Sequence, residues 1–197
     1  MPVVTKLTSQ KQKDFVNLYV DDEFCCGLSL NQVASWRLHK GSELTHDQLD
    51  RLRNEARASK AYNLAIRYLG LRIHSSQEVM EYLRRKEFED VSIAVVGDLK
   101  REGYLQDGDF ALRWSAMRQQ MLWSPRAIRD ELSRKGIPKD IIDDCIGGID
   151  TKEIILGLIA KKSRNRTVNR EKMMSYLVGR GFSYPDIKLC LDESGSK

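Results

Sequence analysis

The sequence is poor in the residues that metal and redox sites need. Of its 197 residues only four are cysteine and three are histidine. Cys25 and Cys26 are adjacent, so they lack the Cys-x-x-Cys spacing of zinc and dithiol sites, and no histidine has a second ligand at metal-binding spacing. No convergent set of polar residues marks a catalytic centre. We therefore expect no enzyme, no metal or other cofactor, and no small-molecule substrate.

Long apolar runs are also missing. No stretch approaches the ~20 apolar residues of a membrane-spanning helix, and residues 1–13 lack the apolar core of a secretory signal. Hydrophobic residues make up 41% of the chain and charged residues 31%, which is typical of a soluble, folded and largely helical protein. We therefore expect a cytoplasmic protein that does not contact membranes.

Positive charge, in contrast, is concentrated in one segment. Between Lys161 and Arg180 there are seven basic residues and one acidic residue, a surplus larger than the net charge of +5 of the whole chain. Such a segment indicates where an anionic partner could bind, although a solvated helix end and loop is the alternative interpretation. The contacts predicted in this segment are Lys161, Lys162, Arg164, Arg166, Arg170 and Lys172.

Three stretches of the chain are nearly the same. They read EYLRRKEF at 81–88, DELSRKGI at 130–137 and SYLVGRGF at 175–182. Shifts of 49 and then 45 residues align Val79, Leu83, Lys86, Phe88, Ile93 and Val96 with Ile128, Leu132, Lys135, Ile137, Ile142 and Cys145, and with Met173, Leu177, Arg180, Phe182, Ile187 and Cys190. The apolar members are predicted to form the core, with the two cysteines as small core residues.

The spacing within each copy predicts two helices joined by a tight turn. The first two apolar positions are four residues apart and so share a helix face. Gly136 and Gly181 follow the first helix, where a left-handed residue commonly ends a helix. Glu87 takes this place in the first copy, which predicts either a different or a strained helix end. Ser75 and Ser124 are predicted N-caps, the latter followed by a proline.

An additional helix is expected upstream of each pair, at 61–72, 110–122 and 152–162. In the second of these, Trp114, Met117 and Met121 are predicted to pack in the core. The fold class is therefore mainly α, with three tandem three-helix repeats that form an elongated curved array. The predicted repeats are 45–105, which includes a lead-in helix, then 106–149 and 150–191, followed by a tail at 192–197.

Residues 1–44 are predicted to form a small extension that contains β-structure. Runs of β-prone residues flank Asp21 and Asp22, a pattern typical of a hairpin with an acidic turn. A short helix is expected at 29–36 and a turn at 39–42. Thr45 and Gln48 have the spacing of a capping box, which starts the lead-in helix.

Part of the sequence resembles the bacterial RecX regulators of the RecA recombinase. The resemblance covers about Thr5 to Cys190 and is carried by AYNLAIRYLGLRIHSSQEVMEYLRRKEF (61–88), LKREGYLQDGDFA (99–111) and ELSRKGI (131–137). Its most specific parts are the helix at 61–71, the turn at 103–107 with Phe110 and Ala111, and the step at 135–137. Glu87 replaces the usual glycine, and Gln106 is a second departure. The resemblance implies three tandem three-helix repeats and an N-terminal extension.

The resemblance also implies a function: binding the RecA nucleoprotein filament, damping its ATPase and strand exchange, and limiting the response to DNA damage. Besides the basic segment, we expect filament or DNA-phosphate contacts at Arg84, Arg85, Arg126 and Arg129. An independent helix-turn-helix protein that binds DNA is the alternative. It is disfavoured because neither 91–101 nor 140–146 carries several Arg, Asn or Gln residues on one face. A monomer is expected.

Overall fold

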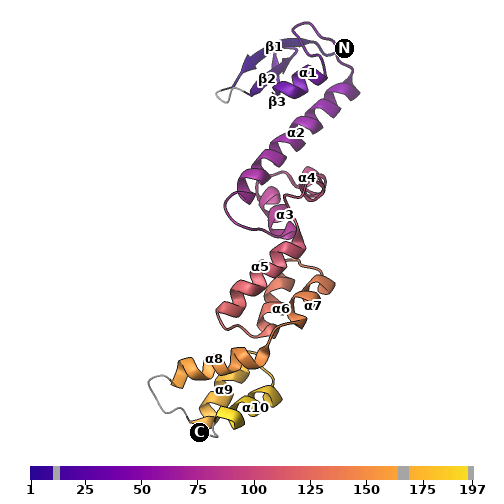
Figure 1. Cartoon of the computed structure of the whole chain (residues 1–197). Helices are drawn as coiled ribbons and strands as arrows, with labels where there is room; N and C mark the ends of the chain where they lie inside the picture. The colour runs from indigo at the N-terminus through magenta and orange to yellow at the C-terminus, as the bar shows by residue number, and fades with distance from the viewer. Residues whose placement is uncertain (11–13, 164–168, 195–197) are drawn as a thin grey trace. The chain divides into compact units, whose positions relative to one another are not determined.

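The computed structural model describes residues 1–10, 14–163 and 169–194 (Figure 1). The chain divides into two units. The first comprises Met1–Ile73 and Val79–Leu105, and the second comprises His74–Glu78 and the described residues from Gln106 onward. Among the described residues, no helix is both long enough and apolar enough to span a bilayer.

A three-stranded antiparallel sheet begins the first unit. Its strands are β1 (Val4–Ser9), β2 (Phe15–Val20) and β3 (Glu23–Ser29), in the order β1-β2-β3. The acidic turn between β2 and β3 is confirmed, and both of its aspartates have positive φ. Strand β1 was not predicted. A register shift between Val4 and Lys6 breaks the alternation of buried and exposed residues by which a strand is recognised.

Two helices follow the sheet, each starting with a capping box. Helix α1 (Leu30–Ser35) begins after Ser29, and α2 (His46–Leu69) begins after Thr45, as predicted. Helix α2 continues without a break through the predicted start of a separate helix at residue 61. Its N-terminal half packs on the sheet and its C-terminal half packs on the helices of the first repeat.

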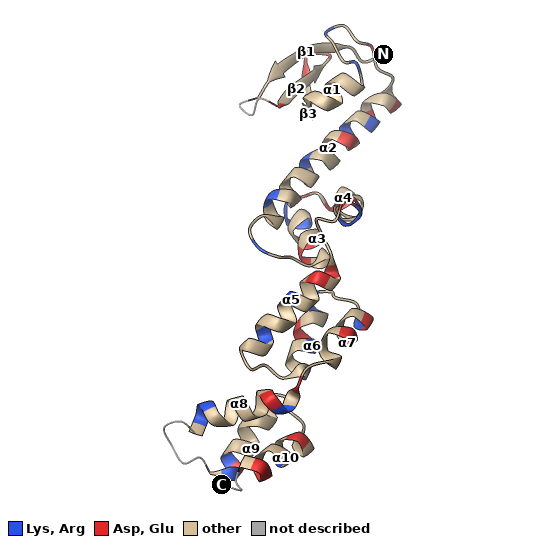
Figure 2. Cartoon of the chain, in the orientation of Figure 1, with Lys and Arg blue, Asp and Glu red and all other residues tan. Residues whose placement is uncertain are grey.

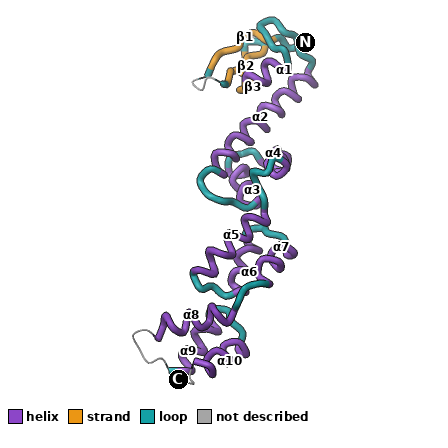
Figure 3. Tube along the Cα trace, in the orientation of Figure 1, coloured by secondary structure: helices purple, strands orange, loops and turns teal. Residues whose placement is uncertain are grey.

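Eight further helices in the described part of the chain complete the repeats, and the tube in Figure 3 shows how loops separate them. The remaining helices of the first repeat are α3 (Ser76–Arg85) and α4 (Glu89–Arg101). The second repeat contains α5 (Asp107–Gln120), α6 (Pro125–Arg134) and α7 (Lys139–Gly147), and the third contains α8 (Thr151–Ser163), α9 (Arg170–Gly179) and α10 (Tyr184–Ser194). The predicted fold class, mainly helical with tandem three-helix repeats behind a small sheet, is confirmed.

The predicted core register is correct for the central helix of each repeat. The two apolar positions of the pattern are buried in α3, α6 and α9; they are Val79 and Leu83, Ile128 and Leu132, and Met173 and Leu177. The apolar residue after each left-handed turn is also buried. Of the two predicted core cysteines, Cys190 is buried and Cys145 is half-buried.

The prediction for Ile93 is wrong, because its side chain is 79% exposed. Ser92 is buried in the equivalent place. Helix α4 starts directly after Phe88, whereas Pro138 separates α7 from the buried Ile137. The first copy therefore lacks one residue before its last helix, and the correct shift for that helix is 50 residues rather than 49.

The core face predicted for α5 is also wrong in part. Met117 and Met121 are 39% and 56% exposed, whereas Phe110, Ala111 and Ser115 are buried. Trp114 is half-buried, and its ring stacks on Phe110 with the centroids 5.3 Å apart. Apolar residues occur on both sides of this helix, so periodicity alone did not indicate which side faces the core.

Candidate partner-binding surfaces

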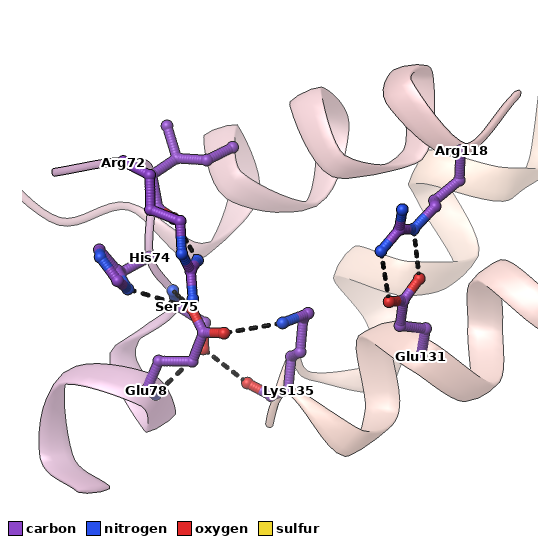
Figure 4. A network of polar contacts seen from close by, with 8 residues as sticks. Arg72, His74, Ser75, Glu78, Arg118, Glu131 and Lys135 are labelled. Carbon is purple, nitrogen blue, oxygen red and sulfur yellow. Dashed lines mark hydrogen bonds and ion pairs between the residues drawn. The ribbon is translucent and has the colours of Figure 1, made fainter. Parts of the chain in front are cut away.

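Within the second unit, the same hydrogen bond joins two helix ends twice. Ser75 precedes α3, and its Oγ donates to the backbone carbonyl of Lys135 over 2.7 Å (Figure 4). Ser124 precedes α6, and its Oγ donates to the backbone carbonyl of Arg180, also over 2.7 Å. Each serine Oγ additionally accepts from a backbone amide of its own helix. One N-cap residue therefore starts its helix and holds the end of the corresponding helix one repeat further on. We call each of these contacts a clasp.

The clasps explain why glycine occupies the left-handed turns. Gly136 and Gly181 have φ values of 73° and 88°. A Cβ at Gly136 would lie 2.6 Å from Cβ of Gln77, and a Cβ at Gly181 would lie 3.0 Å from Oγ of Ser124. A side chain at these positions would therefore have both an unfavourable backbone conformation and a steric overlap.

The turn of the first repeat has a different contact. Glu87 has a φ of 65°, so of the two predicted alternatives the structure has the strained, left-handed helix end. Its carbonyl accepts a hydrogen bond from the Arg57 guanidinium, which also donates to Asp90 over 2.7 Å. The partner of this turn is therefore a long arginine side chain instead of a serine N-cap.

Two cations in the second repeat are used for folding. Lys135 Nζ lies 2.7 Å from Glu78 Oε1 (Figure 4). It also lies 4.1 Å from the centroid of the Trp114 ring. Arg118 donates twice to Glu131, over 2.7 Å each time. These groups are mostly buried against neighbouring side chains, so they are poor candidates for binding a partner.

The Arg118–Glu131 pair also shifts the pKa of both groups. Burial alone would raise the pKa of Glu131, but the hydrogen bonds and the charge of Arg118 outweigh it and the pKa falls. The hydrogen bond to Glu131 raises the pKa of Arg118. The ring centroids of Trp114 and Trp123 lie 4.6 and 4.7 Å from the guanidinium carbon. Both groups are therefore charged at neutral pH.

The residues that correspond to Arg118 and Glu131 form a different type of contact in each repeat. Shifts of about 50 and 44 residues relate Arg118 to Tyr68 and Lys162, and shifts of 49 and 45 relate Glu131 to Tyr82 and Tyr176. In the first repeat Tyr68 stacks on Tyr82, with centroids 4.1 Å apart. In the third, Lys162 Nζ lies 3.3 Å from the centroid of Tyr176. The first contact between helices is aromatic, the second is an ion pair, and the third is a cation on a ring.

Exposed cations lie near one tyrosine of the third repeat, Tyr176. Arg180, which directly follows α9, lies 5.5 Å from the centroid of the Tyr176 ring, and Lys162 on α8 contacts the same ring. Arg126 lies against the same turn, because a Cβ at Gly181 would be 3.7 Å from its Cδ. We call Arg126, Lys162, Tyr176 and Arg180 the basic-aromatic cluster. The three basic side chains are exposed. Because an aromatic ring is neutral, a cation that contacts it keeps its charge and can still bind an anion.

The sequence analysis missed two members of this cluster. Arg180 was counted in the basic segment but was not among the predicted contacts, and Tyr176 was not considered. Their spacing of four residues on α9 was the available signal, since residues four apart lie on one helix face. Figure 2 shows the Lys and Arg residues at the end of α8 and along α9.

The other predicted contacts lie in different surroundings. Lys161 and Lys172 are exposed and form no ion pair with the part of the chain that the structure describes. Arg170 pairs with Asp192, and Arg129 pairs with Asp143. Arg84 and Arg85 are exposed at the end of α3, whereas Arg164 and Arg166 lie outside the described residues. Their role as contacts stays a prediction.

The last helix of the second repeat carries exposed acidic residues. Asp140, Asp143 and Asp144 are exposed on α7. Insertion of this helix into a groove of duplex DNA would bring carboxylates close to phosphates, which is unfavourable.

Family models match three parts of the chain. Residues 2–45 match the N-terminal domain of regulatory protein RecX, residues 61–96 match the first three-helix domain of RecX, and residues 107–146 match the second. Regulatory protein RecX of Lactobacillus gasseri is 33% identical over 155 residues, which cover 78% of this chain and 57% of that protein. That of Bacillus cytotoxicus is 31% identical over 210 residues, which cover 98% and 77%.

Two solved structures are similar to the chain. A crystal structure of a regulatory protein RecX superposes with a TM-score of 0.78 at 23% identity, covering 98% of this chain and all of that one. RecX from Lactobacillus salivarius superposes with a TM-score of 0.62 at 26% identity, covering 70% and 96%. The chain covers only a little more than half of the Lactobacillus gasseri and Lactobacillus johnsonii relatives, 57% and 58%.

Proposed function

The chain belongs to the RecX family of regulatory proteins, and from this premise we propose that it binds the RecA nucleoprotein filament and lowers the ATPase and strand-exchange activities of RecA. The observation that carries the proposal is that the N-terminal region and the first two three-helix repeats match the corresponding domains of RecX. The action is binding, without catalysis by the chain itself. The function belongs to DNA repair and the response to DNA damage.

We propose the basic-aromatic cluster as the central contact, formed by the third repeat together with Arg126 of the second. Lys162 and Arg180 lie near one ring and Arg126 lies against the adjacent turn, so an anionic surface can meet several charges at once. The neighbouring exposed Lys161 and Lys172 extend this positive surface. Phosphates of the filament's DNA or carboxylates of RecA would both fit such a group.

We propose that all three repeats contact the filament, with bounds of 45–105, 106–149 and 150–191. Tandem helical modules present successive equivalent surfaces, which suits a partner that is itself periodic. Arg84 and Arg85 at the end of α3, and Arg129 on α6, are the proposed contacts of the earlier repeats.

The alternative, an independent DNA-binding protein, is less favoured by the described residues. The exposed carboxylates of α7 oppose the approach of phosphates at the helix that would read a groove. A protein-coated filament presents both phosphates and side chains, so a chain with basic residues on one surface and carboxylates on another can bind it.

Co-sedimentation with RecA filaments on single-stranded DNA tests the binding step. The chain is expected to sediment with the filaments and to remain in the supernatant with the same DNA without RecA. The triple variant Arg126→Gln, Lys162→Gln, Arg180→Gln should bind several-fold more weakly, since about three charge-assisted contacts are lost. The matched control removes three exposed charges elsewhere in the second unit, at Arg113, Lys139 and Lys188. Equal binding to DNA with and without RecA would favour the alternative.

A further inference from the structure

A groove of about 580 Å³ lies in the first unit, between β3 and the middle of α2. Its lining includes Phe24, Cys25 and Cys26 of β3 and Arg53, Lys60 and Leu64 of α2. This volume is in the range of sites that hold a small ligand or a few side chains of a peptide. None of the contacts predicted from the sequence lies in it.

The helix side of the groove is strongly basic. Arg53, Arg57, Lys60 and Arg67 follow a spacing of four, three and seven residues, so they form one stripe along α2. At ~1.5 Å per residue the stripe is about 21 Å long. None of the lining residues is a carboxylate, and two carboxylates outside the lining pair with the stripe: Asp50 lies 3.6 Å from Arg53, and Asp90 accepts from Arg57. An occupant with several negative charges along its length is therefore favoured.

The sheet side of the groove is an edge strand. β3 pairs only with β2, so its other edge has no partner strand in the described part of the chain. A register shift opposite Leu18 and Tyr19 leaves Cys25 as the extra residue, and Cys25 and Cys26 both pack toward the core beneath α2. Arg53 Nε donates to Cys25 Sγ over 3.4 Å. Burial raises the pKa of Cys26 to about 12, so this thiol stays neutral and forms part of an apolar wall.

We propose that this groove binds an extended acidic peptide segment of a partner protein. The peptide backbone would add to the free edge of β3, as in other cases of strand addition. Its carboxylates would pair with the stripe on α2, and its apolar side chains would contact Leu64 and Phe24, of which Phe24 is 60% exposed. This inference does not depend on the proposed action on RecA.

Single-stranded nucleic acid fits the groove less well. Binding of bases needs open aromatic faces on which they can stack. Phe88 is only 7% exposed, and Arg57 and Lys60 lie 4.9 and 5.8 Å from its ring centroid. Of the other two rings that line the groove, Phe24 is exposed and Phe15 is half-buried, whereas the edge of β3 offers alternating donors and acceptors that a peptide backbone matches.

The test uses the full chain and a fluorescein-labelled peptide in which Glu alternates with Val. About six to eight residues in extended conformation span the stripe. Fluorescence anisotropy is expected to show salt-dependent binding of this peptide and none of a peptide with Gln in place of Glu. The variant Arg53→Gln, Lys60→Gln should weaken binding by roughly fivefold, since two charge pairs are lost. Arg57 is left in place because it also holds Glu87 and Asp90.

The control variant Lys40→Gln, Arg51→Gln removes two exposed charges from the first unit outside the groove, and it should bind as the parent does. Thermal unfolding establishes that both variants are folded. Equal weakening in the two variants would overturn the proposal, as would the absence of binding at millimolar peptide. Oligothymidylate binding that is lost only in the groove variant, without peptide binding, would assign the site to nucleic acid instead.

Discussion

The clasp between helix ends predicts opposite effects of two substitutions at equivalent positions. Gly136→Ala adds a Cβ at a φ of 73°, 2.6 Å from Cβ of Gln77. The left-handed conformation costs about 1 kcal/mol for a residue with a Cβ, and the overlap adds about 1–3 kcal/mol. The free energy of unfolding should therefore fall by about 2–4 kcal/mol. Glu87→Gly, in the first repeat, removes a Cβ from a φ of 65° and should leave stability unchanged or raise it by up to about 1 kcal/mol.

Urea unfolding followed by circular dichroism and by tryptophan fluorescence measures both effects. Trp114 and Trp123 both lie in the second repeat, near the altered turn. Gly108→Ala is the control, because a Cβ there meets nothing within 4 Å and its φ is not positive. If Gly136→Ala changed stability by less than about 0.5 kcal/mol, the close approach at this clasp would be wrong.

Three further predictions concern the second unit. Leu132→Ala, at a fully buried core position, should lower the free energy of unfolding by ~2–5 kcal/mol in urea titrations; a change below ~0.5 kcal/mol would contradict the register. Ser124→Ala removes an N-cap and a clasp and should cost about 1–3 kcal/mol, whereas the exposed Ser133→Ala should cost little; equal effects would exclude the clasp. Because the folded-state pKa of Glu131 lies below its ordinary 4.5, its contribution to stability is present above that pH and is lost as the pH falls through the folded pKa. Glu131→Gln should flatten this acid dependence in thermal unfolding, and an unchanged profile would show that the ion pair does not contribute.

Local signals predicted much of the fold. Capping residues and the glycine turns depend on a few neighbouring residues, so Thr45, Ser124 and Gly181 marked helix ends correctly. The repeat itself established which residues of the central helices are buried. Where one helix starts a residue earlier, as α4 does after Phe88, the same alignment gave a wrong core residue.

The predictions failed where burial depends on partners distant in sequence. The exposed methionines of α5 and the buried Ser115 could not be distinguished by periodicity, because the side facing the core is set by packing on α7 and α6. The basic-aromatic cluster was missed for a similar reason. Arg126 and Arg180 are far apart in sequence, and the clasp of Ser124 brings them to one turn.

Inhibition of RecA by this chain is the most direct test of the central claim. The measurement is the rate of ATP hydrolysis by RecA on single-stranded DNA, with increasing amounts of the parent chain and of the variant Arg126→Gln, Lys162→Gln, Arg180→Gln, at several salt concentrations. The parent should lower the rate without hydrolysing ATP itself, and the variant should inhibit more weakly and with a flatter dependence on salt, because fewer counterions are released. An unchanged rate of hydrolysis over a wide range of concentrations of the parent chain would contradict the proposed function.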